Sequence, residues 1–277
     1  MQLTHPTRSC ADPINLHLEF MRRTAVGPAI FSVRDVKIGS RISNLHLTLY
    51  QDYYNTGPNI AAESGLSLDT AYRPLPPPLP ADLKRLSSAE GEDENYLLRR
   101  TDAYPDFRAA TLCLQIYLLK PHRRPASHPL SINDQWSRFT PWQREGRWTN
   151  DGLGFVVDMF PQVVEKYINP VVEEAALMEK DDAKLKEILK THAGKAKYWY
   201  PTMTLNLDVK KVLPEEGVEW LFTRTKAKTI KNGRLDLDIE VWDDQGDLVA
   251  TSSHSSLIVD TSRNTTRNGK KTRAGKI

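Results

Sequence analysis

One segment near the C-terminus carries side chains that could do chemistry. The stretch LVATSSHSSLIVD, residues 248–260, begins and ends like a buried strand, but its middle is a run of hydroxyls around one imidazole, His254. Side chains two apart share a face of a strand, so Ser252 and Ser256 are expected beside His254. An imidazole can bind a water and also take its proton. We therefore predict a polar, substrate-binding floor of a pocket; the alternative is an edge strand with His254 in solvent.

Asp158 stands just before a segment with the apolar spacing of a buried helix. The apolar side chains that recur at three- and four-residue intervals are Phe160, Val163, Val164, Tyr167 and Ile168. Asp158 stands where an N-cap belongs, and Pro161 would fall in the first helical turn. The helix dipole favours an ionised carboxylate there, which could polarise a water or orient an imidazole. Asp158 is therefore expected to cap the helix, to act in catalysis, or both.

Further candidates are one hydroxyl and two amides. Thr202 begins the segment TMTLNLDVKK, in which apolar residues alternate from Met203 onward. Because Thr202 has the opposite parity, either a β-bulge turns it inward or it is an ordinary residue at a strand start. Asn206 and Asn59 are candidate contacts for an acyl carbonyl or for a water.

The strands that must position these residues recur along the chain. Period-two alternation, bounded by turn residues such as Asn232-Gly233, predicts them. They cover residues 14–21, 29–38, 42–51, 109–119, 202–211, 218–230, 234–242 and 248–259. The first three align with the three that begin at residue 202, which indicates an internal duplication. The charged segment 173–194 has the spacing of an amphipathic helix.

Composition is typical of a soluble globular protein. Of the 277 residues 39% are hydrophobic and 26% charged. No run approaches the roughly 18 apolar residues of a membrane span, and the N-terminal residues lack the apolar core of a secretory signal. Cys10 and Cys113 are too few for a disulfide framework and have no company that suggests zinc. We expect a cytoplasmic protein without metal or cofactor; the final Gly-Lys-Ile resembles a peroxisomal address only weakly.

The net charge of +3 comes from the C-terminal end. Residues 261–277 hold six basic and no acidic residues, so the remaining 32 basic and 35 acidic residues sum to −3. A tail with so few apolar residues cannot offset its ordering entropy and is expected to be disordered. Because no aromatic residues accompany the charges, we expect no nucleic-acid partner.

Four stretches resemble a known family. They are HLEFMRRTAVGPAIFSVRDVKIGSRISNLHLTLYQ, ESGLSLDTAYRPLPPP, TNDGLGFVVDMFP and the strand-rich segment from PTMTLNLDVKK to SSHSSLIV. Together they resemble the fungal thioesterase-like group, which is similar to acyl-CoA thioesterase II and has a double hot-dog fold. The resemblance covers residues 16–258 and implies an α+β protein with two antiparallel sheets, each wrapped on a central helix.

The resemblance also implies a division of the chain. The expected parts are an N-terminal hot-dog-like repeat (1–120) with a proline-rich loop (52–96), a linker (121–150), a C-terminal hot-dog repeat (151–260) and a disordered basic tail (261–277). Relatives carry a further strand and the first central helix before the segment that starts at Ile14, so this helix is expected to be missing or shortened here. An uncovered apolar sheet face would invite association, so we expect homo-oligomerisation or poor solubility.

A catalytic set follows from the same resemblance. Relatives orient the hydrolytic water with an Asp, a Thr and a Gln, and these positions match Asp158, Thr202 and His254. The first two residue types are retained. At the third position an amide, which can only hold a water, is replaced by an imidazole, which can also take its proton.

We therefore expect hydrolysis of an acyl thioester, linked to CoA or to a carrier protein. One alternative is a hot-dog dehydratase, isomerase or cyclase that acts on a polyketide-like intermediate of fungal secondary metabolism. Another is a non-catalytic acyl-binding protein. The fold alone does not choose among them, whereas release of free thiol from acyl-CoA would.

Overall fold

The computed structural model describes residues 15–20, 27–37, 44–50, 78–99, 109–126, 128–141, 144–160, 162–192 and 197–261. Asn59, much of the proline-rich loop and the basic tail beyond Thr261 lie outside these residues. The chain divides into two compact units, one of residues 20–61 and one of the remainder. Each is described by itself below.

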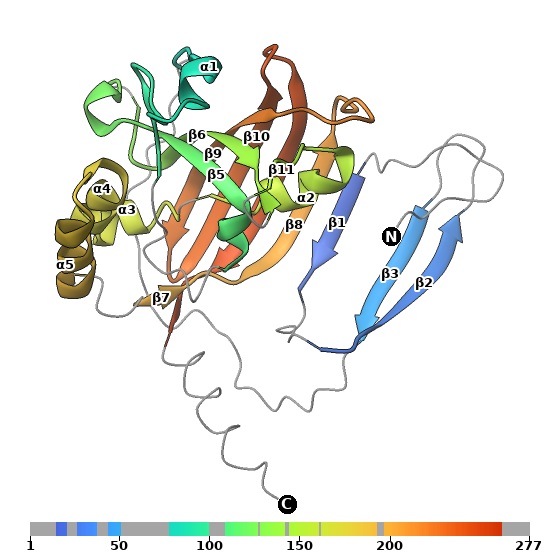
Figure 1. Cartoon of the computed structure of the whole chain (residues 1–277). Helices are drawn as coiled ribbons and strands as arrows, with labels where there is room; N and C mark the ends of the chain where they lie inside the picture. The colour runs from blue at the N-terminus through green and yellow to red at the C-terminus, as the bar shows by residue number, and fades with distance from the viewer. Residues whose placement is uncertain are drawn as a thin grey trace, which may run out of the picture. The chain divides into compact units, whose positions relative to one another are not determined.

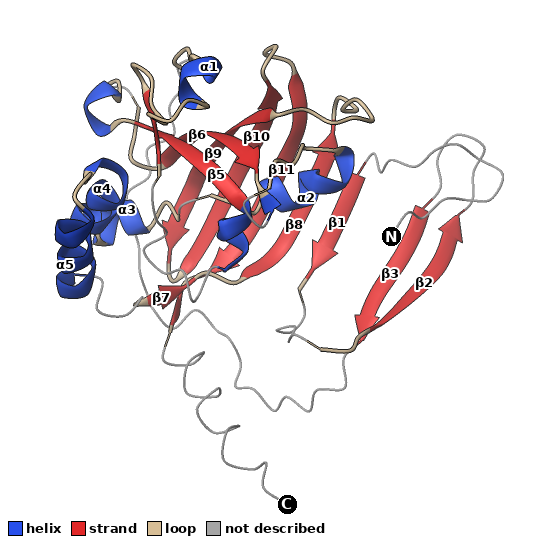
Figure 2. Ribbon diagram, viewed as in Figure 1, coloured by secondary structure: helices blue, strands red, loops and turns tan. Residues whose placement is uncertain are grey.

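The larger unit is built on one antiparallel sheet, which has eight strands in the described part of the chain (Figures 1 and 2). In spatial order they are β1 (Asn15–Glu19), β8 (Thr202–Val209), β11 (Leu248–Leu257), β10 (Arg234–Asp243), β9 (Trp220–Lys231), β6 (Ile132–Phe139), β5 (Leu114–Leu119) and β4 (Tyr96–Leu98). The short strands β7 (Tyr198–Trp199) and β12 (Val259–Asp260) pair with each other.

One face of the sheet packs against the chain that follows β6. Helix α2 (Leu153–Val156) and the turns after it bury apolar side chains in the main core. Those from this segment are Leu153, Val156, Val157, Phe160, Val163 and Val164, and those from the sheet include Leu205, Leu237, Ile239 and Val241. Complete burial of such a side chain is worth roughly 1.5–3 kcal/mol, so this contact fixes the segment on the sheet.

The continuous helix expected after Asp158 is not formed. Helix α2 ends at Val156, and the next helices are α3 (Glu165–Ile168) and α4 (Pro170–Met178). Asn169 leaves the helical conformation, with φ −132° and ψ 49°, just before Pro170, which begins α4. The apolar stripe is therefore buried on short turns and not on one helix. The stripe predicted burial correctly and helix continuity wrongly.

The amphipathic helix expected at 173–194 is also interrupted. Helix α4 ends at Met178, where Glu179 is extended with φ −76° and ψ 120°. Helix α5 then spans Asp182–His192. Besides these, α1 (Leu83–Leu86) is a single turn capped by the side chain of Asp82.

The segment 121–150, expected as a linker, contributes a central strand. Strand β6 pairs with β9 on one side and with β5 on the other. Its residues Asn133, Asp134 and Gln135 are all buried, which the polar sequence did not indicate. The buried negative charge of Asp134 is balanced by Arg224 of β9, which donates two hydrogen bonds to the carboxylate, at 2.7 and 2.6 Å.

In the larger unit, β1, β5 and β4 of the N-terminal half extend the sheet formed by β6 and β8 to β11. Strand β1 pairs antiparallel with β8, its equivalent in the predicted duplication, with Leu16 opposite Leu207. The strand expected at 109–119 begins as a 3-10 turn (Ala109–Cys113) and becomes extended as β5. In the smaller unit, β2 (Ile30–Lys37) and β3 (Asn44–Tyr50) form an antiparallel hairpin.

Candidate active site

Strand β11 presents His254 to the core. His254 has only 3% of its surface exposed, and Ser252 and Ser256 on the same face are buried as well, whereas the residues between them are half-buried. The predicted sharing of a face is therefore confirmed, and the alternative with His254 in solvent is wrong. The strand gives up apolar packing because its inward side chains form a polar cluster.

A β-bulge brings Thr202 to the same place. Ser255 of β11 lies opposite Thr204, but the next residue, Ser256, lies opposite Thr202, so the register of β8 skips one residue. This bulge is one of the two possibilities that the sequence left open, and it turns Thr202 inward. The Thr202 hydroxyl donates to Oδ1 of Asp158 at 3.2 Å.

Asp158 lies in a turn after α2 and does not cap a helix. Its N–H donates to the carbonyl of Phe155, and the residue that precedes α3 is Val164. The N-cap prediction is wrong because the helix that it would cap is not continuous. The Asp158 side chain is 43% exposed, and its Oδ1 lies 3.8 Å from Nδ1 of His254. The three predicted catalytic residues thus converge.

Hydrogen bonds on β11 determine which nitrogen of His254 carries its proton. The Ser252 hydroxyl donates to the backbone carbonyl of Asn206 at 2.6 Å, and Nε2 of His254 lies 3.0 Å from the same hydroxyl oxygen. A carbonyl only accepts, so the proton of Ser252 is committed and its oxygen accepts from Nε2–H. The proton of a neutral ring is therefore on Nε2, and Nδ1 presents its lone pair toward Asp158. No hydrogen bond is made by this buried Nδ1.

Burial keeps the ring neutral. Desolvation lowers the pKa of His254 to about 4 from its ordinary value of 6.5. The ring of Phe160, whose centroid is 6.3 Å from that of the imidazole, contributes to the apolar surroundings. At neutral pH the imidazole is consequently an acceptor next to a carboxylate.

The predicted amide contacts are not part of this cluster. The Asn206 side chain has the opposite parity to Leu205 and Leu207 and bonds to Ser253 and His17 on the other face of the sheet. Only its backbone carbonyl reaches the site, as the acceptor for Ser252. Asn59 lies outside the described residues.

Gln135 is a neighbour of the site that the sequence did not indicate. It is completely buried on β6, and its Nε2 donates to the carbonyl of Met159 at 2.8 Å, next to Asp158. This bond ties the turn that carries the carboxylate to the sheet. Gln135 was not predicted as a site residue because residues 121–150 were expected to form a linker and not a strand of the sheet.

Among the described residues, no three or more His, Cys, Asp or Glu side chains are grouped so that they could hold a metal ion. None of the helices there has the length and apolar character to cross a membrane.

Family comparisons match nearly the whole chain. The model of the acyl-CoA thioesterase N-terminal domain matches residues 1–63, and that of the acyl-CoA thioesterase C-terminal domain matches residues 80–258. The thioesterase-like protein TwmA of Talaromyces wortmannii is 31% identical, over 97% of this chain and 82% of that protein.

Solved structures share the fold. A hot-dog protein of unknown function from Alicyclobacillus acidocaldarius has a TM-score of 0.58 and 16% sequence identity. The match covers 93% of this chain and 82% of that protein's chain. A thioesterase II candidate from Thermobifida fusca YX has a TM-score of 0.55 and 16% sequence identity. That match covers 89% of this chain and 78% of the other chain. These likenesses confirm the predicted hot-dog architecture within the α+β class.

Proposed function

Because the chain belongs to the acyl-CoA thioesterase family, we propose that it hydrolyses an acyl thioester with a water activated between Asp158 and His254. The observation that carries this proposal is the meeting of two acceptors. The Nδ1 lone pair of a neutral His254 and the Oδ1 of Asp158 face each other across 3.8 Å.

Such a pair calls for a donor that serves both atoms. The separation of 3.8 Å is too long for a direct hydrogen bond. A water beside the line between the two atoms can reach both at ordinary hydrogen-bond distances and donate one proton to each. The His254 side chain is enclosed and that of Asp158 is 43% exposed, so the water and the substrate would approach from the side of the carboxylate.

The reaction then follows from this arrangement. The water oxygen attacks the thioester carbonyl carbon while its proton moves to Nδ1 of His254. The carboxylate of Asp158 stabilises the imidazolium that forms. Collapse of the tetrahedral intermediate breaks the C–S bond, and the leaving thiolate takes the proton back from Nδ1, so the products are a carboxylic acid and a thiol.

The remaining contacts give two positioning roles. Thr202 holds the carboxylate through its hydrogen bond to Oδ1, and Ser252 holds the ring in the tautomer that leaves Nδ1 available. The structure thus supports a division of labour that differs from the expectation that Asp158 orients the imidazole. We propose acyl-CoA or an acyl carrier thioester as the substrate.

The test is release of free thiol from a panel of acyl-CoA thioesters, followed with a thiol-reactive dye. His254→Ala should abolish release, and His122→Ala, at an exposed histidine, should retain it. Undiminished release by His254→Ala would refute the assignment. Binding of acyl-CoA by the wild type with no release across the panel would instead indicate an acyl-binding protein.

A further inference from the structure

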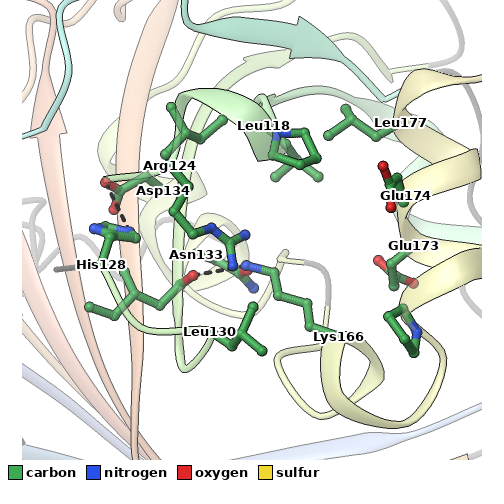
Figure 3. A pocket seen from close by; sticks show the side chains of 14 residues that line it. Leu118, Arg124, His128, Leu130, Asn133, Asp134, Lys166, Glu173, Glu174 and Leu177 are labelled. Atoms are coloured by element: carbon green, nitrogen blue, oxygen red, sulfur yellow. Dashed lines mark hydrogen bonds and ion pairs between the residues drawn. The ribbon is translucent and has the colours of Figure 1, made fainter. Parts of the chain in front are cut away.

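A cavity lies between β5, β6 and α4, and none of Asp158, Thr202 and His254 lines it (Figure 3). Its volume of about 360 Å³ is within the range of small-molecule sites. Part of its wall is aliphatic, from Leu118, Leu130, Ile132 and Leu177. The lining also includes titratable side chains that the proposed hydrolysis does not use.

Two cations line this cavity without a counter-ion. Arg124 and Lys166 point toward each other in Figure 3. The Nζ of Lys166 donates to the carbonyl of Ile132 at 2.8 Å, and the buried Nε of Arg124 makes no hydrogen bond. Throughout the described ranges, neither of the two forms an ion pair with a carboxylate.

The acidic groups of the cavity do not compensate these charges. Asp134 is committed to Arg224, and Glu173 lies 3.3 Å from Arg99. Glu174 is exposed and stands across the cavity on α4 (Figure 3). Positive charge is therefore left over in the interior of the cavity, next to Arg124.

The titration behaviour of Lys166 agrees with this imbalance. Desolvation and the neighbouring charge of Arg124 lower the pKa of Lys166 to about 7. His128, which is buried on the cavity wall, has a pKa lowered by desolvation, and its Nε2 lies 3.7 Å from Oδ2 of Asp134. An anion in the cavity would give Arg124 and Lys166 the counter-ion that they lack.

We infer that this cavity binds the carboxylate of a short amphiphilic acid, with its head group between Arg124 and Lys166 and its chain along the aliphatic wall. A monoanion fits better than a doubly charged phosphate because Glu173 and Glu174 border the same space. This site is distinct from the proposed hydrolytic site and does not depend on it.

Octanoate is the probe, and isothermal titration calorimetry of the full chain is the measurement. Octanoate should bind the wild type, and Arg124→Gln should weaken binding by roughly tenfold to a hundredfold, since a charge-assisted hydrogen bond is lost. Arg123→Gln is the matched control, because the neighbouring Arg123 is exposed and pairs with Glu94. Equal affinity for Arg124→Gln and the wild type, or equal binding of 1-octanol, would overturn the inference.

Two further arms make the result unambiguous. Arg124→Gln should melt no earlier than the wild type without ligand, because it removes a partly desolvated charge that has no partner, so loss of binding is not loss of folding. Tighter binding of octyl phosphate than of octanoate would overturn the carboxylate assignment. His254→Ala should bind octanoate like the wild type, whatever its effect on thiol release.

Discussion

At the scale of single residues, the two nitrogens of His254 have different roles. Nε2 is held by Ser252, whose own proton is committed to a backbone carbonyl, and Nδ1 is left to act as a base. The residue types of the site were predictable from the resemblance, and the shared face of Ser252 and His254 from strand periodicity. The tautomer was not, because it depends on which carbonyl of β8 lies opposite Ser252.

Removal of the Ser252 hydroxyl tests this role. In Ser252→Ala the ring can protonate on either nitrogen, so kcat should fall roughly tenfold to a hundredfold with little change in KM, as for loss of one hydrogen bond to an essential group. Ser253→Ala, on the opposite face, should behave like the wild type. Nitrogen NMR of the imidazole should show Nε2–H in the wild type and a tautomer mixture in Ser252→Ala; an unchanged spectrum would contradict the role.

The depressed pKa of His254 also predicts how stability depends on pH. Its pKa is about 4 in the folded protein and 6.5 when unperturbed, so between these values the unfolded chain binds the extra proton. Stability from this source is complete above pH 6.5 and decreases by about 3 kcal/mol as the pH falls to about 4. Denaturant unfolding should show that His254→Gln loses correspondingly less than the wild type over this range. Parallel curves for the two proteins would contradict burial of a neutral imidazole.

At the scale of elements, irregularities in the strands and turns form the site. The bulge between β8 and β11 turns Thr202 inward, and the interrupted helix leaves Asp158 in a turn. Hydrophobic periodicity predicted which residues are buried, but it carries no information on where a helix is broken or a register skips. Strand β6 was not predicted for a related reason. It buries polar residues on both faces, and their burial requires hydrogen-bond partners such as Arg224, which lie far away in the sequence.

The bulge predicts a contrast between two threonines of β8. Thr202→Val keeps the shape but removes the hydrogen bond to Asp158, so kcat should fall by roughly tenfold to a hundredfold. Thr204→Val, in the same strand and on the regular side of the bulge, should leave the rate of thiol release unchanged. Comparable losses in both variants would mean that strand stability and not the inward hydroxyl is responsible.

At the scale of the whole molecule, the hairpin β2–β3 has an apolar face of its own. The residues Phe31, Val33, Leu47 and Leu49 of this face are between 39% and 58% exposed. Association through an uncovered sheet face was expected from the sequence and remains a prediction. We assign it to this apolar face of the hairpin.

Light scattering after size-exclusion chromatography tests this expectation. We predict that the wild type elutes as a homo-oligomer and that Leu47→Glu, which places a charge in the centre of the apolar face, shifts it toward the monomer. Ser32→Glu, on the opposite face of the hairpin, is the matched control and should leave the mass unchanged. A monodisperse wild-type monomer with no dye-detectable apolar patch would contradict the prediction.

The central claim, that His254 takes the proton of the attacking water, is tested most directly by the rate of thiol release of His254→Gln. An amide can hold the water, but it cannot accept its proton at neutral pH. We predict a fall in kcat of roughly a hundredfold to ten-thousandfold, the usual contribution of general base catalysis. A rate close to that of the wild type would show that His254 only holds the water and would contradict the account.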